Sequence, residues 1–403
     1  MRRSWQSRGC CVNDLAPLRW KRDSLVGEAR TRVLRGRGDL DEVEPIYRHL
    51  WSQTPAQPPT LDFDWVRAWW DLHNRDGRLF IVVLERGGRP LALAPLYTRH
   101  REASARGLLR TVYFLGTGEN DADEVFGTNT GWLGAAEHHG ELTRSVGAAL
   151  RTHRGAWDRL WLINMAPDIE LAEELPRALD ATLLTVEQRA SCNWVIDLPE
   201  SLDAYIAGVA KGKTRTNLRR VLRKAQSDGL ECEWISAVEP ALAAFEELVE
   251  LHSRQWQDRG KPGACASDLF CAFQREMLAR YARQGRLWLL RITYRKRPVV
   301  VRYDIAAGRR LYAYITGVDP ELGRHSGGTL SLLKAIELAT ARGFETLDML
   351  SGNYDYKHRL ATRQMPIATL EAYGCTPASR AWLTLRGLRR KVRRGADSAA
   401  AEV

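Results

Sequence analysis

The sequence predicts an α/β protein built from two similar mixed sheets, each flanked by helices. Two observations support this prediction: one supersecondary pattern occurs twice in the chain, and in the second copy a glycine-rich turn joins a strand to a helix. The chain has 403 residues, of which 44% are hydrophobic, and this is enough for two domains with separate cores.

The repeated pattern is a strand hairpin followed by a long helix and a further strand. Both hairpins contain an Arg-Pro pair after the turn, and every matching position is shifted by 208 residues. The later strand is shifted by 188, so the first copy holds about twenty additional residues, mostly in the polar segment 116–134. The matching segments are 77–84, 89–94 and 154–160 in the first copy and 285–292, 297–302 and 342–348 in the second.

Hydrophobic periodicity predicts the helices of the second copy. In the last of them, apolar residues recur at helical spacing and mark a buried face, namely Leu332, Leu333, Ile336 and Ala339. The segment 193–199 is expected to cross from the first domain to the second. The expected helices are 202–227, 241–256, 269–284 and 330–341, and the expected strands beside the glycine-rich turn are 311–315 and 346–350.

The net charge of +11 is concentrated at the two ends of the chain. Residues 1–38 carry +7 and residues 386–403 carry +4, so the body between them is neutral. Basic ends of this kind are typically solvated and disordered, and contact with RNA or anionic lipid is the alternative. We expect a disordered arm over 1–38, a first domain over 39–192, a second domain over 193–385 and a basic tail over 386–403. A chain shortened to 39–385 should then keep its fold.

The remaining composition favours a cytoplasmic protein without a metal site. No apolar run is long enough to cross a bilayer, and no apolar segment follows Arg2 and Arg3 as a secretory signal would require. The seven cysteines are scattered, without the spacing of a disulfide framework or a metal site. Peripheral membrane contact stays open.

A glycine-rich turn predicts an anion site in the second copy. The chain leaves the expected strand 311–315, passes through Ser326, Gly327 and Gly328, and enters the expected helix. Backbone N–H groups at the positive end of a helix bind phosphate groups without side-chain help. The sequence therefore predicts a pyrophosphate-binding turn here.

The corresponding segment of the first copy is acidic and therefore unsuited to phosphate. Glu119 and Asp121 belong to this segment, which contains four carboxylates between Gly116 and Glu124. Recognition of a cationic or amine-bearing acceptor is one interpretation, and a solvated surface loop is the other.

Two further helices carry candidate binding residues. On the first of them, basic residues recur every four positions, at Lys211, Arg215, Arg219 and Arg223. This spacing puts them on one face of the helix, which is either a solvated basic face or a platform that binds anions. Arg215 and Arg219 are the preferred anion-binding candidates. On the next helix, His252 and Trp256 are either packing residues or part of the acceptor site.

A polar cluster follows the last expected strand. Asp348 lies in an apolar segment, where a carboxylate needs an ion-pair partner or a catalytic role. Tyr356 and Lys357 follow shortly after Gly352, whose turn can direct them toward a ligand. Their alternative role is packing, with the tyrosine hydroxyl bonded to a neighbour.

These features together resemble the acyl-CoA half of a GNAT N-acetyltransferase. The closest likeness is to the CelD-like branch, which is itself similar to the FemABX aminoacyltransferases. The GNAT pyrophosphate motif R-x-x-G-x-G/A corresponds here to Arg324–Thr329. The resemblance implies a tandem GNAT-like pair whose second copy binds acetyl-CoA or another acyl-CoA. The residues that it assigns to this site are Thr316, Gly317, Arg324, Ser326, Gly327, Gly328 and Thr329.

The resemblance also implies a reaction, namely acyl transfer from the thioester to an amine on a small molecule or a glycan. Asp348 would accept the amine proton, Lys357 would stabilise the oxyanion, and Tyr356 would protonate the leaving sulfur. A role in polysaccharide or cell-envelope biosynthesis would fit the CelD-like branch. The alternatives are a FemABX-like transferase that uses aminoacyl-tRNA and a non-catalytic GNAT-like scaffold.

Overall fold

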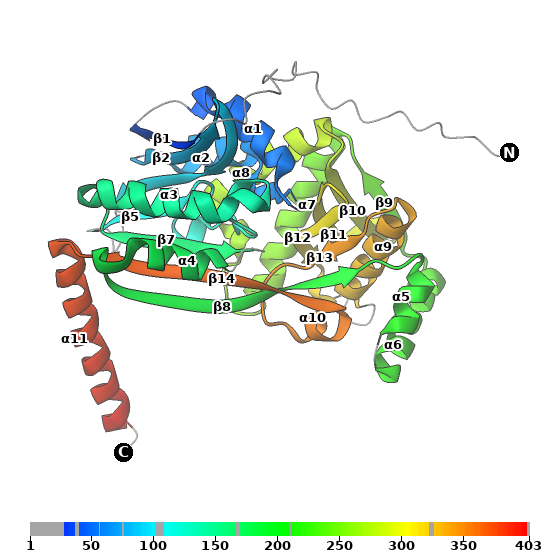
Figure 1. Ribbon diagram of the computed structural model, residues 1–403. Coiled ribbons are helices and arrows are strands. Elements are labelled where there is room, and N and C mark those ends of the chain that lie inside the picture. The colour runs from blue at the N-terminus through cyan, green and yellow to red at the C-terminus, as the bar shows by residue number, and fades with distance from the viewer. Residues whose placement is uncertain are drawn as a thin grey trace. The chain divides into compact units, whose positions relative to one another are not determined.

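Each half of the chain forms a mixed sheet flanked by helices in this computed structural model (Figure 1). The structure describes residues 28–36, 40–55, 57–74, 76–100, 109–166, 170–209, 211–321 and 326–400. These residues fall into two compact units. The first unit contains residues 28–194, Ser351–Asn353 and residues 364–400, and the second unit contains Val195–Leu350 and Tyr354–Arg363.

The first unit has a sheet of order β6-β3-β2-β4-β5-β7-β14-β8, with β1 paired to β2. From β6 to β14, and between β1 and β2, neighbouring strands are antiparallel except β5 with β7, which is parallel. Its core is built from these strands, from α3 and α4, and from the buried indoles of Trp132 and Trp157. The elements are β1 Ala29–Gly36, α1 Glu44–Gln53, α2 Phe63–His73, β2 Arg78–Arg86, β3 Arg89–Ala94, β4 Leu96–His100, β5 Arg110–Phe114, β6 Leu133–Gly134, α3 His139–Thr152, β7 Arg159–Met165, α4 Glu170–Leu179, β8 Leu183–Asp197, β14 Arg363–Gly374 and α11 Pro377–Ala400.

The second unit has a sheet of order β13-β12-β11-β10-β9, and the last residues of β8, Val195–Asp197, pair with β13. Only the pair of β12 with β13 is parallel. The elements are α5 Leu202–Gly208, α6 Gly212–Ser227, β9 Glu231–Ile235, α7 Val238–Gln257, α8 Asp268–Arg283, β10 Leu287–Tyr294, β11 Arg297–Ala307, β12 Arg310–Val318, α9 Gly327–Ala341, β13 Thr346–Asp348 and α10 Asp355–Leu360.

The two predicted hairpins, β2 with β3 and β10 with β11, match down to their irregularities. The register shifts between Leu84 and Glu85 in the first hairpin and between Ile292 and Thr293 in the second, again 208 residues apart. In each case the Pro of the Arg-Pro pair lies opposite the shifted residue, where a missing backbone N–H is tolerated. The fold therefore contains the same hairpin and mixed-sheet pattern twice, as the sequence predicted.

Helices α7 and α9 cover opposite faces of the second sheet. A Cβ atom added at Gly317 would lie 2.8 Å from the backbone oxygen of Leu248 in α7. The neighbouring Val318 points the other way, and its Cγ2 lies 4.0 Å from a Cβ atom built on Gly328 of α9. The end of β12 thus lies next to the N-terminal turn of α9.

The first strand, β1, corrects the prediction of a disordered arm over residues 1–38. Ala29–Gly36 pairs with β2 along its whole length, as β9 pairs with β10 in the second unit. Val33 packs against the hydrophobic core, while several other β1 residues are exposed. The arm therefore contributes the strand of the first copy that corresponds to β9. Residues 1–27 and 37–39 lie outside the described part of the chain.

A chain that begins at Asp39 should consequently be less stable than one that begins at Glu28. Without β1, one edge of β2 loses its strand partner and the contact of Val33 with the core is lost. We expect a melting temperature lower by about 5 °C or more, since 1 kcal/mol corresponds to roughly 2–4 °C in a domain of this size. Scanning calorimetry of the two shortened chains measures the difference, and equal melting temperatures would contradict the role given to β1.

The C-terminal part of the chain also differs from the expected boundaries. Residues 193–385 were assigned to the second domain, but β14 pairs with β7 and belongs to the first unit. Most of the expected tail 386–403 lies in α11 and is helical up to Ala400. This helix is fixed to the first unit at its start, where the Ser379 hydroxyl donates to the Asp158 carbonyl oxygen at 2.7 Å.

Candidate functional site

The N-terminal turn of α9 has the geometry of an anion site. Ser326 is the N-cap residue, has a left-handed backbone with φ 51°, and makes no side-chain capping bond. The first turn contains no acidic residue, and Gly328 is exposed. The amides of Gly327, Gly328 and Thr329 are thus presented at the positive helix end. Arg324, the first residue of the predicted motif, lies outside the described residues.

Strand β13 is paired along its whole length, but only with the beginning of β12. The pairing covers Arg310 to Tyr312 on β12 and ends at Asp348 on β13, whereas β12 continues to Val318. Beyond Tyr312, β12 therefore extends past the end of β13, toward the N-terminal turn of α9. An extended ligand can bind along a strand edge of this kind.

Two predicted cofactor residues lie on the end of β12. Thr316 is half-buried and pairs with Arg302 of β11. Gly317 is buried against α7, where an added Cβ would also lie 2.9 Å from Leu251 Cβ. Close packing of the strand on α7 therefore explains why this residue is a glycine.

Asp348 and Lys357 both bind the peptide groups of Leu350. The Asp348 Oδ1 atom accepts from the Leu350 N–H at 2.8 Å, and the Lys357 ammonium donates to the Leu350 carbonyl oxygen at 3.2 Å. Asp348 is fully buried and also lies 4.0 Å from the Arg310 guanidinium. Leu350 has a left-handed backbone with φ 61°, which is unfavourable for a bulky residue and ends β13 earlier than predicted. The two side chains thus hold a strained turn.

Tyr356 lies at the surface of this cluster, 43% exposed, with its ring stacked on that of Tyr354 at a centroid distance of 6.0 Å. Partial burial raises the pKa of its hydroxyl above the usual value, and the positive charge of Arg302 opposes that rise. Tyr356 can therefore donate a proton at neutral pH.

A buried ion pair beside Tyr356 was missed by the sequence analysis. Arg302 Nε donates to Asp304 Oδ2 at 2.7 Å, and both side chains are buried. Burial raises the pKa of Asp304, although Arg302 opposes the effect. Among the described residues, Arg302 Nη2 and Asp304 Oδ1 have no hydrogen-bond partner. The sequence feature that could have predicted this ion pair is an Arg and an Asp two positions apart within a mainly apolar segment.

The basic residues of α6 differ in their surroundings. The expected helix is interrupted between α5 and α6, and Arg215 donates to the Val209 carbonyl oxygen at 2.6 Å across this break. Arg219 is exposed on α6. Arg215 therefore stabilises the connection, and Arg219 stays an anion-binding candidate.

His252 and Trp256 pack against each other and against the loop after α7. Their ring centroids are 5.8 Å apart, and a Cβ added at Gly263 would lie 2.8 Å from Trp256 and 2.9 Å from His252. Burial, with a contribution from Arg259, lowers the pKa of His252 to about 4, so the imidazole is neutral at pH 7. Its Nδ1 atom has no hydrogen-bond partner within the described residues.

Glu119 anchors the acidic segment of the first unit internally. Its Oε1 atom accepts from the Val125 N–H at 2.8 Å, and its Oε2 atom accepts from the Trp69 indole N–H at 3.0 Å. Asp121 lies on the short 3-10 helix Asp121–Asp123 and is exposed. The geometry favours a structural role for Glu119 and solvation for Asp121.

The buried Glu119 predicts a pH-dependent stability. Burial raises the pKa of Glu119 to about 7 from about 4.5, so the folded state binds its proton more tightly than the unfolded state. Stability from this group should fall by about 3 kcal/mol as the pH rises from about 4.5 to about 7. Urea titrations of wild type and Glu119→Gln across this range should show the variant gaining relative stability with pH. A difference that is independent of pH would contradict the shifted pKa.

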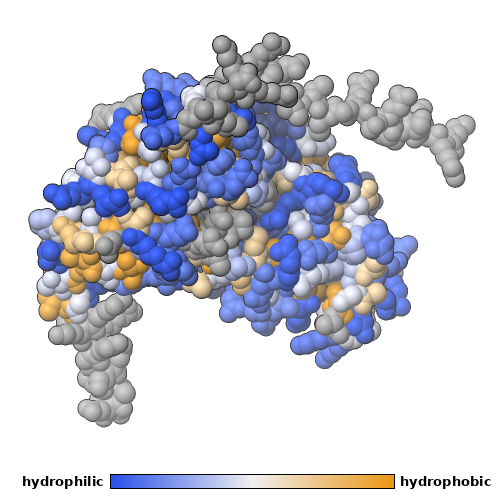
Figure 2. Space-filling model, in the orientation of Figure 1, coloured by the Kyte–Doolittle hydropathy of each residue, from blue (hydrophilic) through white to orange (hydrophobic). Residues whose placement is uncertain are grey.

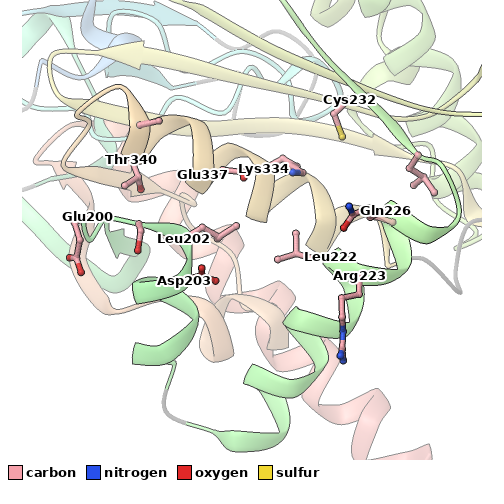
Figure 3. A pocket seen from close by; sticks show the side chains of 14 residues that line it. Glu200, Leu202, Asp203, Leu222, Arg223, Gln226, Cys232, Lys334, Glu337 and Thr340 are labelled. Atoms are coloured by element: carbon pink, nitrogen blue, oxygen red, sulfur yellow. Dashed lines mark hydrogen bonds and ion pairs between the residues drawn. The ribbon is translucent and has the colours of Figure 1, made fainter.

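A separate pocket lies beside the C-terminal half of α9 (Figure 3). It has a volume of about 800 Å³ and is formed by the start of α5, by α6 and by α9. Arg223 is at its rim, together with the paired Lys334 and Glu337, whose charged groups are 2.8 Å apart. The α9 turn and the Asp348–Lys357 cluster are not part of its lining. The pocket is therefore distinct from the anion site.

Neither a membrane span nor a metal cluster is present among the described residues. In that part of the chain no helix combines the length and apolar character needed to span a membrane. Likewise, no three His, Cys, Asp or Glu side chains of the described residues are grouped as a metal site would require.

Part of the second copy is similar to a known family of domains. Residues 212–358 match the family model of an acetyltransferase (GNAT) domain, which includes the α9 turn and the Asp348–Lys357 cluster. The crystal structure of FemX is similar, with 9% identity and a TM-score of 0.57 over 87% of this chain and 99% of that chain. A tandem GNAT protein from the clavulanic acid biosynthesis pathway shows 12% identity and a TM-score of 0.44, again over 87% and 99%. None of the curated proteins matches the chain.

Proposed function

We propose that this protein is a GNAT-type acyltransferase that transfers an acetyl or other acyl group from acyl-CoA to an amine. The observation that carries the proposal is the position of the uncapped α9 turn beside the end of β12, the part of β12 that extends past the end of β13. The family match over residues 212–358 supports the same reaction class. We also propose that the protein belongs to the CelD-like branch and acts in the cytoplasm.

The residues at this site suit acyl-CoA. The amides of Gly327, Gly328 and Thr329 would bind the pyrophosphate. Gly328 is exposed and leaves room for it, because the nearest atom to a Cβ added at this position is 4.0 Å away. The edge of β12 from Tyr312 to Thr316 would bind the pantetheine arm and orient the carbonyl. The ligand itself would supply the thioester.

The polar cluster supplies the groups that acyl transfer needs. Lys357 places a positive charge near the end of β13, where it would stabilise the oxyanion. Tyr356 is exposed and would protonate the leaving thiolate. Asp348 would be the base, or would act by holding Leu350 and, through Leu350, Lys357 in place. His252, Trp256 and Arg219 are the proposed acceptor-binding residues.

A binding and turnover assay tests the proposal. Calorimetric titration with acetyl-CoA should show one site per chain, and a panel of small-molecule and glycan amines should contain an acceptor that is acetylated. Native mass spectrometry of protein from its own host should show retained CoA or acyl-CoA. Absence of CoA binding would overturn the proposal. Salt-sensitive binding of aminoacyl-tRNA would then favour the FemABX-like alternative, and binding of neither would favour the scaffold.

A further inference from the structure

Helix α11 has an anchored first half. The Trp382 side chain is buried, and its indole N–H donates to the Tyr373 hydroxyl at 3.1 Å. The Arg386 guanidinium donates to Glu187 Oε2 at 2.9 Å. These bonds join α11 to β14 and β8 of the same unit, so the direction of the helix is fixed at its start.

Apolar side chains are exposed just beyond this anchor. Leu385 is 47% exposed and Leu388 is 56% exposed, and both are among the few large apolar residues at the surface of the described chain. Hydrophobic surface is visible at the start of α11 (Figure 2).

The same stretch of helix is strongly basic. Arg389, Arg390, Lys391, Arg393 and Arg394 follow the exposed leucines, and no acidic residue occurs between Arg386 and Arg394. A helix with an apolar stripe beside many Arg and Lys residues is the type that lies in the interface of an anionic membrane. Basic charges contribute attraction to anionic headgroups, and leucines contribute burial between the acyl chains.

We propose that α11 docks this protein on an anionic lipid surface through Leu385, Leu388 and the basic residues 389–394. Charge alone would suit RNA equally well, but RNA phosphates offer nothing that would cover two exposed leucines. A second copy of the chain is disfavoured because it would bring two clusters of five positive charges together. The proposal is independent of the acyl-transfer reaction.

Vesicle flotation with the full chain tests the docking. We expect wild type to bind vesicles that contain phosphatidylglycerol and not vesicles of phosphatidylcholine alone. The double variant Leu385→Glu/Leu388→Glu should bind the anionic vesicles at least about tenfold less, because two apolar side chains are replaced by charges of the wrong sign. Val186→Glu, at an exposed apolar position on β8 that is 37% exposed, is the matched control and should bind as wild type does.

Folding of the double variant is checked by its melting temperature and by its far-UV circular dichroism spectrum, both of which should match wild type. If Leu385→Ala/Leu388→Ala and the Glu variant both bind anionic vesicles as tightly as wild type, the leucines are not involved and the proposal is wrong. It is also wrong if wild type does not bind vesicles. In that case RNA binding in a filter assay, or a dimer in light scattering that the double variant abolishes, would identify what covers the helix instead.

Discussion

Gly328→Glu should weaken acetyl-CoA binding by about 2 kcal/mol or more, which corresponds to roughly 30-fold in the dissociation constant. The substitution places a carboxylate at the N-terminal turn of α9, where backbone amides would otherwise bind pyrophosphate oxygens. An added Cβ makes only an ordinary contact, 4.0 Å from Val318, so the fold should tolerate the change. Calorimetric titration measures the effect.

Two matched variants separate charge from general disturbance. Gly328→Gln has nearly the same size without the charge, so its effect should be smaller. Gly208→Glu introduces the same charge at an exposed position at the end of α5, with no heavy atom within 4 Å of an added Cβ, and should leave affinity unchanged. If folded Gly328→Glu binds acetyl-CoA as wild type does, the donor site is elsewhere and the proposed function loses its main support.

The parts of the fold that could be predicted have strong local patterns. The Arg-Pro pairs at residues 89–90 and 297–298 revealed the repeated hairpin. In the structure, both hairpins change their pairing register at matching positions. The glycine-rich turn predicted that a helix begins near Leu330. In the structure α9 begins three residues earlier, at Gly327. Turn chemistry and helical periodicity are local properties, so one sequence contains them.

The parts that could not be predicted depend on distant partners. The strand β1 contains three arginines and is exposed along much of its length, so it lacks the alternation by which half-buried strands are recognised. The pairing of β14 with β7 joins residues about two hundred positions apart, and no local signal specifies it. The contact of Asp348 with Arg310 has the same origin, since it requires β12 and β13 to lie side by side.

Lys357→Met should lower the rate of acyl transfer by roughly 10²-fold or more while leaving acetyl-CoA affinity unchanged, as expected when one oxyanion stabiliser is lost. Methionine keeps much of the aliphatic length, so the buried site stays filled. The variant also leaves the Leu350 carbonyl without its lysine donor, at a cost in stability of about 1–3 kcal/mol. Single-turnover rates and the melting temperature must therefore be measured together. A wild-type rate in folded Lys357→Met would make the lysine structural.

Asp348→Asn then distinguishes the two roles proposed for Asp348. If the carboxylate accepts the amine proton, the defect should shrink at high pH, where more of the acceptor amine is already neutral. If Asp348 acts by holding Leu350, the defect should be the same at every pH and should accompany a lower melting temperature, because the ion pair with Arg310 is lost as well. The bond from the Leu350 N–H and the full burial of the carboxylate favour the second result, in which Asp348 positions the turn and Lys357 interacts with the reacting carbonyl.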